Sequence, residues 1–205
     1  ALDYYHRSLD IKVRVVGQEH ISVADTYNNM AIVYKSQGHY ERALEYYQKD
    51  LDITIKLVGH DHPDVAKSYG NIGNVLDEMG KPEEALVQLK KALEVFVAVF
   101  GYEHLDVAAV YNSIGIVYRK KGDLENALLQ HQRALEIRTR VFGSEHPSVA
   151  GSSLNMGLVC RSQEKTEEAK EMFTKAYSIF LKVLGPDHPQ TQRAKRRSRL
   201  KPEPE

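Results

Sequence analysis

The sequence predicts an all-α protein, a solenoid built from antiparallel helix pairs. The first observation is a 42-residue repeat in which each copy has a glycine followed three residues later by a histidine, at Gly17, Gly59, Gly101, Gly143 and Gly185 and at His20, His62, His104, His146 and His188. The second is that each copy holds two segments whose apolar residues recur every three or four positions, as Val23, Tyr27 and Met30 do, a spacing typical of one helix face. Because such a repeat marks stacked helical units, we expect one elongated array.

The helix ends carry local signals. Pro63, Pro147 and Pro189 follow the repeated histidine, where a first helical residue needs no amide. The repeated glycines suit the left-handed residue that ends a helix, and Gly38 suits the tight turn inside a pair. We therefore expect helices near 2–16, 21–36, 40–58, 63–79, 82–100, 105–121, 124–142, 147–163, 166–184 and 189–200.

The period divides the chain into repeats. Residues 1–20 are the second half of a preceding repeat, and complete repeats follow at 21–62, 63–104, 105–146 and 147–188. We expect a capping helix at 189–200 and a disordered tail at 201–205, which has nothing apolar to bury. Because the chain begins inside a repeat, we expect it to be a fragment of a longer protein.

Small residues recur where paired helices must approach closely, and here the sequence resembles a known family. The pattern Ile114-Gly115, Tyr118, Gly122, Ala127 and Ala134 resembles the tetratricopeptide repeat over residues 1 to about 188. The usual unit has about 34 residues. The longer unit, with a Gly-x-x-His-Pro-x-Val-Ala link, is similar to the kinesin light chain and nephrocystin-like branch. The resemblance implies a right-handed superhelix with a concave peptide groove.

Two features depart from a regular array. Asp50 stands where the other copies have Ala92, Ala134 and Ala176, so we expect the first pair to be loosely packed there or to contact something outside the chain. The half-repeat at 1–16 is expected to leave an apolar edge uncovered, and its residues include Leu2, Leu9 and Val13.

Composition argues against several classes of function. No apolar run approaches the roughly 20 residues of a membrane-spanning helix, and we expect no membrane partner. Cys160 is the only cysteine, so no disulfide forms within the chain and a cytoplasmic location is favoured. Six of the 28 basic residues lie between Arg193 and Lys201. The rest of the chain is net acidic, and nucleic-acid binding is not expected.

The repeated histidines are tempting as metal ligands, but equivalent positions lie a helix pair apart. That separation is on the order of 10–20 Å, whereas Zn–N bonds are about 2.0–2.1 Å. We interpret the histidines as turn or cap residues. The sequence contains no phosphate loop, His-Glu-x-x-His motif or serine elbow, so we expect no enzyme activity, no metal and no cofactor.

The candidate site is a peptide groove on the first helix of each pair. Asparagine is a mediocre helix former, yet it recurs mid-helix. One repeated place holds Asn29, Asn71, Ser113 and Asn155, the neighbouring place holds Asn28 and Asn112, and Asn74 lies one turn further. An amide both donates and accepts, so such a row suits a peptide backbone of any sequence. The alternative is that these amides bond the neighbouring helix backbone or face water.

Specificity is expected from residues that differ between copies. Lys35, Arg119 and Arg161 near the ends of first helices are candidates for pairing with acidic ligand side chains, or else are solvated surface charges. A related subfamily grips chaperone carboxyl termini through groove lysines. That mode is not expected, because Asn28, Gly70, Asn112 and Leu154 stand where such a lysine is needed.

Taken together, these features predict a non-enzymatic adaptor or scaffold that binds an extended segment of another protein, with a kinesin-light-chain-like cargo adaptor as one form. Two alternatives stay open: a structural repeat that self-associates through its terminal repeats, and a sensory module that regulates an attached domain. For the basic stretch from Arg193 to Lys201 the readings are a capping helix, a nuclear-import-like signal or a contact with an anionic surface.

Overall fold

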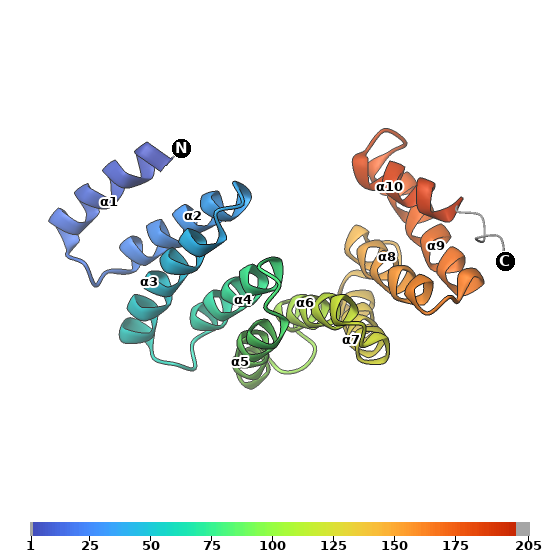
Figure 1. Ribbon diagram of the computed structural model, residues 1–205, viewed down its shortest axis with the longest axis horizontal. Helices are drawn as coiled ribbons and strands as arrows, with labels where there is room; N and C mark the ends of the chain where they lie inside the picture. The colour runs from blue at the N-terminus through green and yellow to red at the C-terminus, as the bar shows by residue number, and fades with distance from the viewer. Residues whose placement is uncertain (1, 200–205) are drawn as a thin grey trace. The chain divides into compact units, whose positions relative to one another are not determined.

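The computed structural model describes residues 2–199, and none of these residues forms a strand. The predicted helix pairs are confirmed (Figure 1). The helices are α1 (Leu2–Val16), α2 (Ile21–Ser36), α3 (Tyr40–Val58), α4 (Pro63–Glu78), α5 (Pro82–Phe100), α6 (Leu105–Lys121), α7 (Leu124–Phe142), α8 (Pro147–Ser162), α9 (Thr166–Leu184) and α10 (Pro189–Ser198). The helices α4, α8 and α10 end slightly before their predicted ends. Residue 200 and the predicted tail at 201–205 lie outside the described residues.

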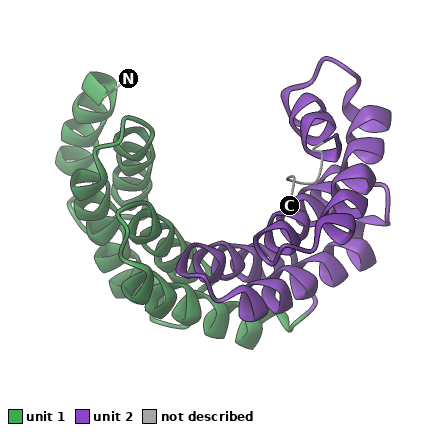
Figure 2. Cartoon of the chain, turned by 45° about the vertical axis from the view of Figure 1, so that its right-hand side comes forward, with its two compact units in different colours: residues 1–102 green, residues 103–205 purple. Residues whose placement is uncertain are grey.

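The chain divides into two compact units, residues 1–102 and residues 103–205 (Figure 2). In unit 1, α2 pairs with α3 and α4 with α5, while α1 packs on α2 and α3 packs on α4. In unit 2, α6 pairs with α7 and α8 with α9, while α7 packs on α8 and α10 packs on α9. Each unit is therefore a stack in which every pair covers the apolar stripe of its neighbour.

The repeated histidines are the N-caps of α2, α4, α6, α8 and α10. In each, the ring Nδ1 accepts the backbone N–H two residues on, as His62 does from Asp64 at 3.2 Å and His146 from Ser148 at 3.1 Å. The cap satisfies one amide that the first helical turn leaves unpaired. The interpretation of these residues as caps is confirmed. Within residues 2–199, no group of histidine, cysteine or acidic side chains is arranged to hold a metal ion.

The glycines before these caps differ in one respect from the prediction. Gly59 has φ 83° and ψ 172°, and Gly101 has φ 77° and ψ 174°. The positive φ is as expected, but the extended ψ leaves the left-handed helical region for one that is essentially restricted to glycine. The chain therefore straightens after each second helix and passes into the link, rather than curling over the helix end.

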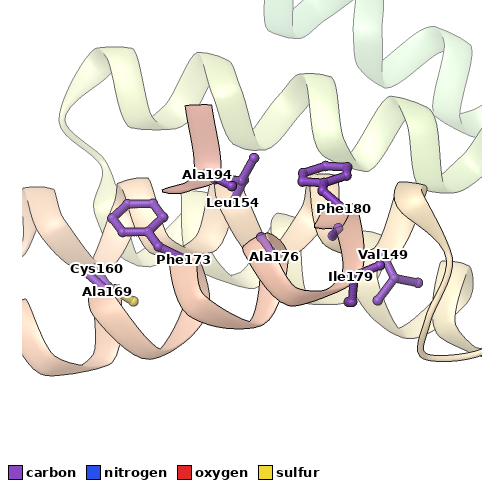
Figure 3. Packing of buried hydrophobic residues seen from close by; sticks show 10 residues of the cluster. Val149, Leu154, Cys160, Ala169, Phe173, Ala176, Ile179, Phe180 and Ala194 are labelled. Carbon is purple, nitrogen blue, oxygen red and sulfur yellow. The ribbon is translucent and has the colours of Figure 1, made fainter. Parts of the chain in front are cut away.

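Paired helices approach most closely where a glycine of the first faces a large side chain of the second. A Cβ placed on Gly73 would lie 2.8 Å from Leu89, one on Gly115 2.8 Å from His131, and one on Gly157 2.6 Å from the ring of Phe173. Figure 3 shows Phe173 in one cluster with Leu154 of α8 and Ala194 of α10. The helix α10 thus covers the apolar face of the last pair.

The expectation for Asp50 is wrong. Its side chain is only 6% exposed, and its carboxylate accepts hydrogen bonds from Ser68 of α4 at 2.6 Å and from Thr54 at 3.5 Å. The partner Ser68 lies in the next helix pair of the same unit. Asp50 is therefore packed and bonded, because Ser68 supplies a hydroxyl at the place where α3 meets α4.

The expectation for the apolar edge of α1 also needs correction. Leu2, Leu9 and Val13 are half-buried, on the side of the helix that packs on α2. The most exposed apolar residues of this helix are Tyr4, Ile11 and Val15, at 78%, 62% and 76% of their surface. Their spacing of seven and four residues places them on one face of the helix. The uncovered edge is therefore real, but other residues form it.

Candidate functional site

In unit 1, the predicted asparagines meet across two helix pairs. The Nδ2 of Asn71 in α4 donates to the Oδ1 of Asn28 in α2 at 3.1 Å. Both side chains are half-buried, whereas Asn29 is exposed. Asn74, one turn beyond Asn71, is half-buried as well. The amide pair therefore links the first helices of adjacent pairs on one surface.

Unit 2 repeats this arrangement. The Nδ2 of Asn155 in α8 donates to the Oδ1 of Asn112 in α6 at 2.7 Å, and both residues are half-buried. Ser113, which holds the place of Asn155 in α6, is half-buried as well. In both units the bond joins the place held by Asn28 and Asn112 to the place held by Asn71 and Asn155 in the next copy of the repeat. In each unit we call the surface that carries these amides the first-helix face; it lies on α2 and α4 in unit 1 and on α6 and α8 in unit 2.

A second repeated contact involves the tyrosine that stands before the place of Asn28 and Asn112 in the first helix. Lys49 lies over the ring of Tyr27 at 5.8 Å, Lys91 over Tyr69 at 5.2 Å and Arg133 over Tyr111 at 5.4 Å. In each pair the cation belongs to the second helix and the tyrosine to the first. Each contact is worth about 0.5–1 kcal/mol at an exposed site. These contacts from the second helix restrict rotation of the first helix about its own axis, and so they fix the direction in which its amides point.

The cations predicted to select acidic ligands are distributed unevenly. Lys35 is half-buried at the end of α2 in unit 1. In unit 2, Arg119 at the end of α6 is half-buried and Arg161 at the end of α8 is exposed. Burial lowers the pKa of the Arg197 guanidinium of α10, and the charges of Arg193, Arg161 and Arg119 lower it further. The structure therefore gathers the predicted arginines of unit 2 around the capping helix.

A cleft of about 250 Å³ opens beside this cluster. Its walls come from five helices of unit 2, and the residues that line it are Asn112, Arg138, Gly151, Leu154, Asn155, Phe180, Gln190, Arg193 and Arg197. Three of them are arginines and none is acidic. We call this feature the arginine cleft. Sequence reasoning placed Asn112 and Asn155 at a site, but it missed Arg138. It interpreted the arginines of α10 as part of a capping helix, an import-like signal or a contact with an anionic surface, and not as part of that site.

Arg138 is held by the helix that follows it. Its Nη1 donates to the Ser152 hydroxyl at 2.8 Å and to the Ser148 carbonyl at 3.5 Å. Both of these acceptors are uncharged, and burial lowers the pKa of this guanidinium. Lys12 makes the same contacts three repeats earlier, in unit 1, to the Ser22 carbonyl and the Thr26 hydroxyl. The sequence offered a weak signal for this residue, because the place holds a cation at Lys12 and Arg138 but Thr54 and Phe96 in the copies between.

Comparison with known proteins agrees with this architecture. The tetratricopeptide repeat model matches residues 46–98, 78–140 and 106–182, and a second model of that description matches residues 23–64. The comparison with curated proteins gave no match. The structure of BtubC (BKLC) from P. vanneervenii is similar, with 26% identity and a TM-score of 0.78 over 92% of this chain and 75% of that one.

Two further solved structures share the fold. Both are of a Podosopora anserina protein described as a kinesin light chain with nearly identical TPR-like repeats, one of them with a single substitution. Each is 21% identical to this chain and covers 87% of it, with TM-scores of 0.73 and 0.74 and coverage of 85% and 84% of the other chain. At this identity the likeness concerns the fold alone.

Proposed function

This chain belongs to the tetratricopeptide repeat family, and from that membership we propose that it is a non-enzymatic module that binds an extended segment of another protein along its first-helix face. Repeats of this family are protein-interaction modules. Among residues 2–199, no helix is long and apolar enough to span a membrane. The peptide mode and the role as an adaptor or scaffold are our proposal, and the kinesin-light-chain-like fold supports a cargo adaptor as one form of it.

The observation that carries the proposal is the hydrogen-bonding capacity left on the amide pairs. The bond between the two side chains uses one N–H of Asn71 and the carbonyl oxygen of Asn28. Asn28 keeps its two N–H donors and Asn71 keeps its carbonyl oxygen. An extended peptide offers backbone N–H and C=O groups alternately, with a rise of about 3.3 Å per residue. Each pair can therefore bind a backbone on both sides without reading its side chains.

The same pairing supports the preorganisation of the site. A free asparagine side chain loses rotamer freedom when it binds, which opposes affinity by about 0.5–1.5 kcal/mol for each immobilised side chain. The bonds between Asn28 and Asn71 and between Asn112 and Asn155 restrict these rotamers before a ligand arrives. In each unit, binding a backbone then costs less entropy than it would for two independent amides.

The test uses a peptide selected from a displayed random library and calorimetry. We expect Asn28→Ala with Asn71→Ala to weaken binding by about 1–3 kcal/mol, because two backbone hydrogen bonds are lost. Gln48→Ala is the matched control, since this exposed amide lies on α3 and bonds to Asp52. A peptide that binds the double variant as tightly as the parent, with an unchanged melting temperature, excludes the first-helix face.

A second candidate function is self-association through α1, favoured by the exposed apolar face of Tyr4, Ile11 and Val15. Light scattering over a concentration series should show a rising mean mass for the parent. We expect Ile11→Glu with Val15→Glu to remove the rise, while Val87→Glu, an equally apolar exposed site on α5, leaves it. A parent of constant monomer mass rules this candidate out.

A further inference from the structure

We propose that the arginine cleft of unit 2 binds the phosphoryl group of a phosphorylated side chain, carried by a peptide that lies on the first-helix face. This inference rests on the proposed function and specifies the chemistry of the partner at the unit 2 part of that surface. It concerns Arg138, Arg193 and Arg197 with the amides of Asn112 and Asn155.

The first step is the charge of the cleft. Its lining includes three guanidinium groups and no carboxylate. No salt bridge within the described residues involves Arg193 or Arg197, and Arg138 donates there to a hydroxyl and a backbone carbonyl. Arg138 and Arg197 are half-buried, whereas Arg193 is exposed, and burying the first two without an opposite charge is costly. The positive charge of the cleft thus has no opposite charge among its lining residues, and an anion from another molecule supplies it.

The surroundings do not supply that anion. Burial lowers the pKa of the Arg197 guanidinium, and the charges that act on it next are Arg193, Arg161, Arg119 and Arg196, all of the same sign. Arg197 does lie over the ring of Phe173, at 6.0 Å, but a ring face offsets only a small part of a full charge. The positive potential of the cleft is therefore reinforced from the ends of α6 and α8.

The magnitude of the charge decides between two kinds of anion. A carboxylate brings one negative charge and leaves most of the charge of three guanidinium groups uncompensated. A phosphoryl group carries about −1.5 to −2 at pH 7 and has three strong acceptor oxygens. Guanidinium forks match such oxygens bidentately. The phosphoryl group therefore fits both the charge and the number of donors better than an acidic side chain does.

The position of the cleft argues for a peptide as the carrier. Asn112 and Asn155 line the cleft and also form the amide pair of unit 2 at 2.7 Å. A backbone bound at that pair would place a neighbouring side chain directly over the arginines. Polymeric nucleic acid, which carries one charge per about 1.7 Å of duplex, would instead need a row of cations beyond one cleft of about 250 Å³.

The experiment measures fluorescence anisotropy of the full chain with three capped peptides of glycine, alanine, serine and threonine that differ only at the central residue: serine, glutamate or phosphoserine. We expect the phosphoserine peptide to bind about tenfold or more tightly than the serine peptide, with the glutamate peptide close to serine. Arg197→Gln and Arg193→Gln should each remove most of this preference. Arg140→Gln is the matched control, because that exposed arginine of α7 pairs with Glu103 and does not line the cleft.

Other outcomes overturn the proposal. Equal binding of the three peptides excludes a phosphoryl site, and a glutamate peptide as tight as phosphoserine indicates a site for any acid. Inorganic phosphate that binds as tightly as the phosphoserine peptide indicates a small-anion site, and an oligothymidine that binds more tightly indicates nucleic acid. Arg138→Lys, which keeps the charge and removes the fork, should lower the preference while Nζ still reaches Ser152; an unchanged preference removes Arg138 from the site.

The two proposals fail separately. If Asn28→Ala with Asn71→Ala weakens the serine and phosphoserine peptides alike while the arginine variants change nothing, the peptide groove stands and the phosphoryl site is wrong. If the arginine variants abolish the preference while the unit 1 amides have no effect, the cleft is a phosphoryl site and the amide groove of unit 1 is wrong.

Discussion

His131 occupies a place that other copies fill with Tyr47, Leu89 and Phe173. Like Leu89 and Phe173, it lies against a glycine of the first helix. It is fully buried, and within the described residues neither of its ring nitrogens has a hydrogen-bond partner. Burial, followed by the charges of Arg119 and Arg138, lowers its pKa to about 4. A buried polar group without a partner costs about 1–3 kcal/mol, and at this repeated place only the copy with His131 carries that cost within residues 2–199.

We expect His131→Leu to stabilise the protein by about 1–2 kcal/mol at pH 7, because Leu89 fills the equivalent site against Gly73 without polar atoms. The folded pKa is about 4, below the unfolded value near 6.5. The parent therefore loses stability as the pH falls from about 6.5 to about 4, by roughly 3 kcal/mol at most. Denaturant melts across this range should show that His131→Leu abolishes the loss.

His60→Gln serves as the control for that measurement, since His60 is exposed in the link before α4. It should leave the slope of stability against pH as it is in the parent. A His131→Leu variant that is less stable than the parent at pH 7, or that keeps the full acid slope, contradicts the account of this residue.

Asp50 makes stability depend on pH with the opposite sign to His131. Burial raises its pKa to about 6, while the hydrogen bond from Ser68 acts to lower it. The native state therefore binds the proton more tightly than the unfolded chain, and stability falls as the pH rises from about 3.8 to about 6. We expect Asp50→Ala, which installs the residue found in the other copies, to gain about 1 kcal/mol at pH 7.5 and to flatten that interval.

Asp52→Ala is the companion variant, because Asp52 is exposed on the same helix and accepts a bond from Gln48. It should change stability little at pH 7.5 and across the pH interval in which Asp50 acts. If Asp50→Ala proves destabilising at pH 7.5, the bond to Ser68 outweighs the desolvation of the carboxylate.

At the scale of the helix, the role of a glycine depends on whether a second helix packs closely against it. Gly157 lies against the ring of Phe173 and the Ala169 carbonyl, which a Cβ at this position would meet at 2.6 Å and 3.2 Å. Gly70 also lies within a helix, yet a Cβ there meets nothing within 4 Å. The same residue type is thus required for contact at one position and is merely tolerated at the other.

This contrast predicts opposite effects of one substitution. Gly157→Ala should destabilise by about 1–3 kcal/mol through overpacking of the α8–α9 contact. Gly70→Ala should stabilise by about 0.5–1 kcal/mol, because alanine loses less backbone freedom on folding. Thermal unfolding of both variants tests the pair. Changes of the same sign would show that close helix approach does not govern these glycines.

The elements also differ in how firmly each is attached to its unit. The helix α1 has no buried residue, whereas α10, although short, buries Thr191 and Ala194. In α4, seven residues are buried, Val65, Ala66, Ser68, Ile72, Gly73, Val75 and Leu76. In a stacked array each repeat contacts only its neighbours, so a helix covered on one side opens most easily.

Hydrogen exchange over the whole chain should follow this order. We expect the amides of α1 to exchange roughly tenfold or more faster than those of α4, because local opening exposes little buried apolar surface. The amides of α10 should lie between them. Protection of α1 equal to that of α4 would mean that another surface covers this helix in solution.

Much of the architecture could be predicted from residue types and spacing alone. The helix pairs follow from apolar stripes, and the caps at His62 and His146 follow from a repeated turn. These features depend on interactions within a few residues, which a periodic pattern encodes directly. The extended ψ of Gly59 was not predicted, because positive φ permits two conformations and the link that follows decides between them.

For the candidate site, the sequence by itself determined which helix of each pair carries the amides and that arginines stand at the ends of α6 and α8. Only the tertiary structure decided that Asn71 bonds Asn28, that Asp50 reaches Ser68, and that Arg138 of α7 and Arg197 of α10 line one cleft. The reason is physical: a helix period fixes direction around one axis, whereas contacts between helices depend on the angles and distances at which those axes pack.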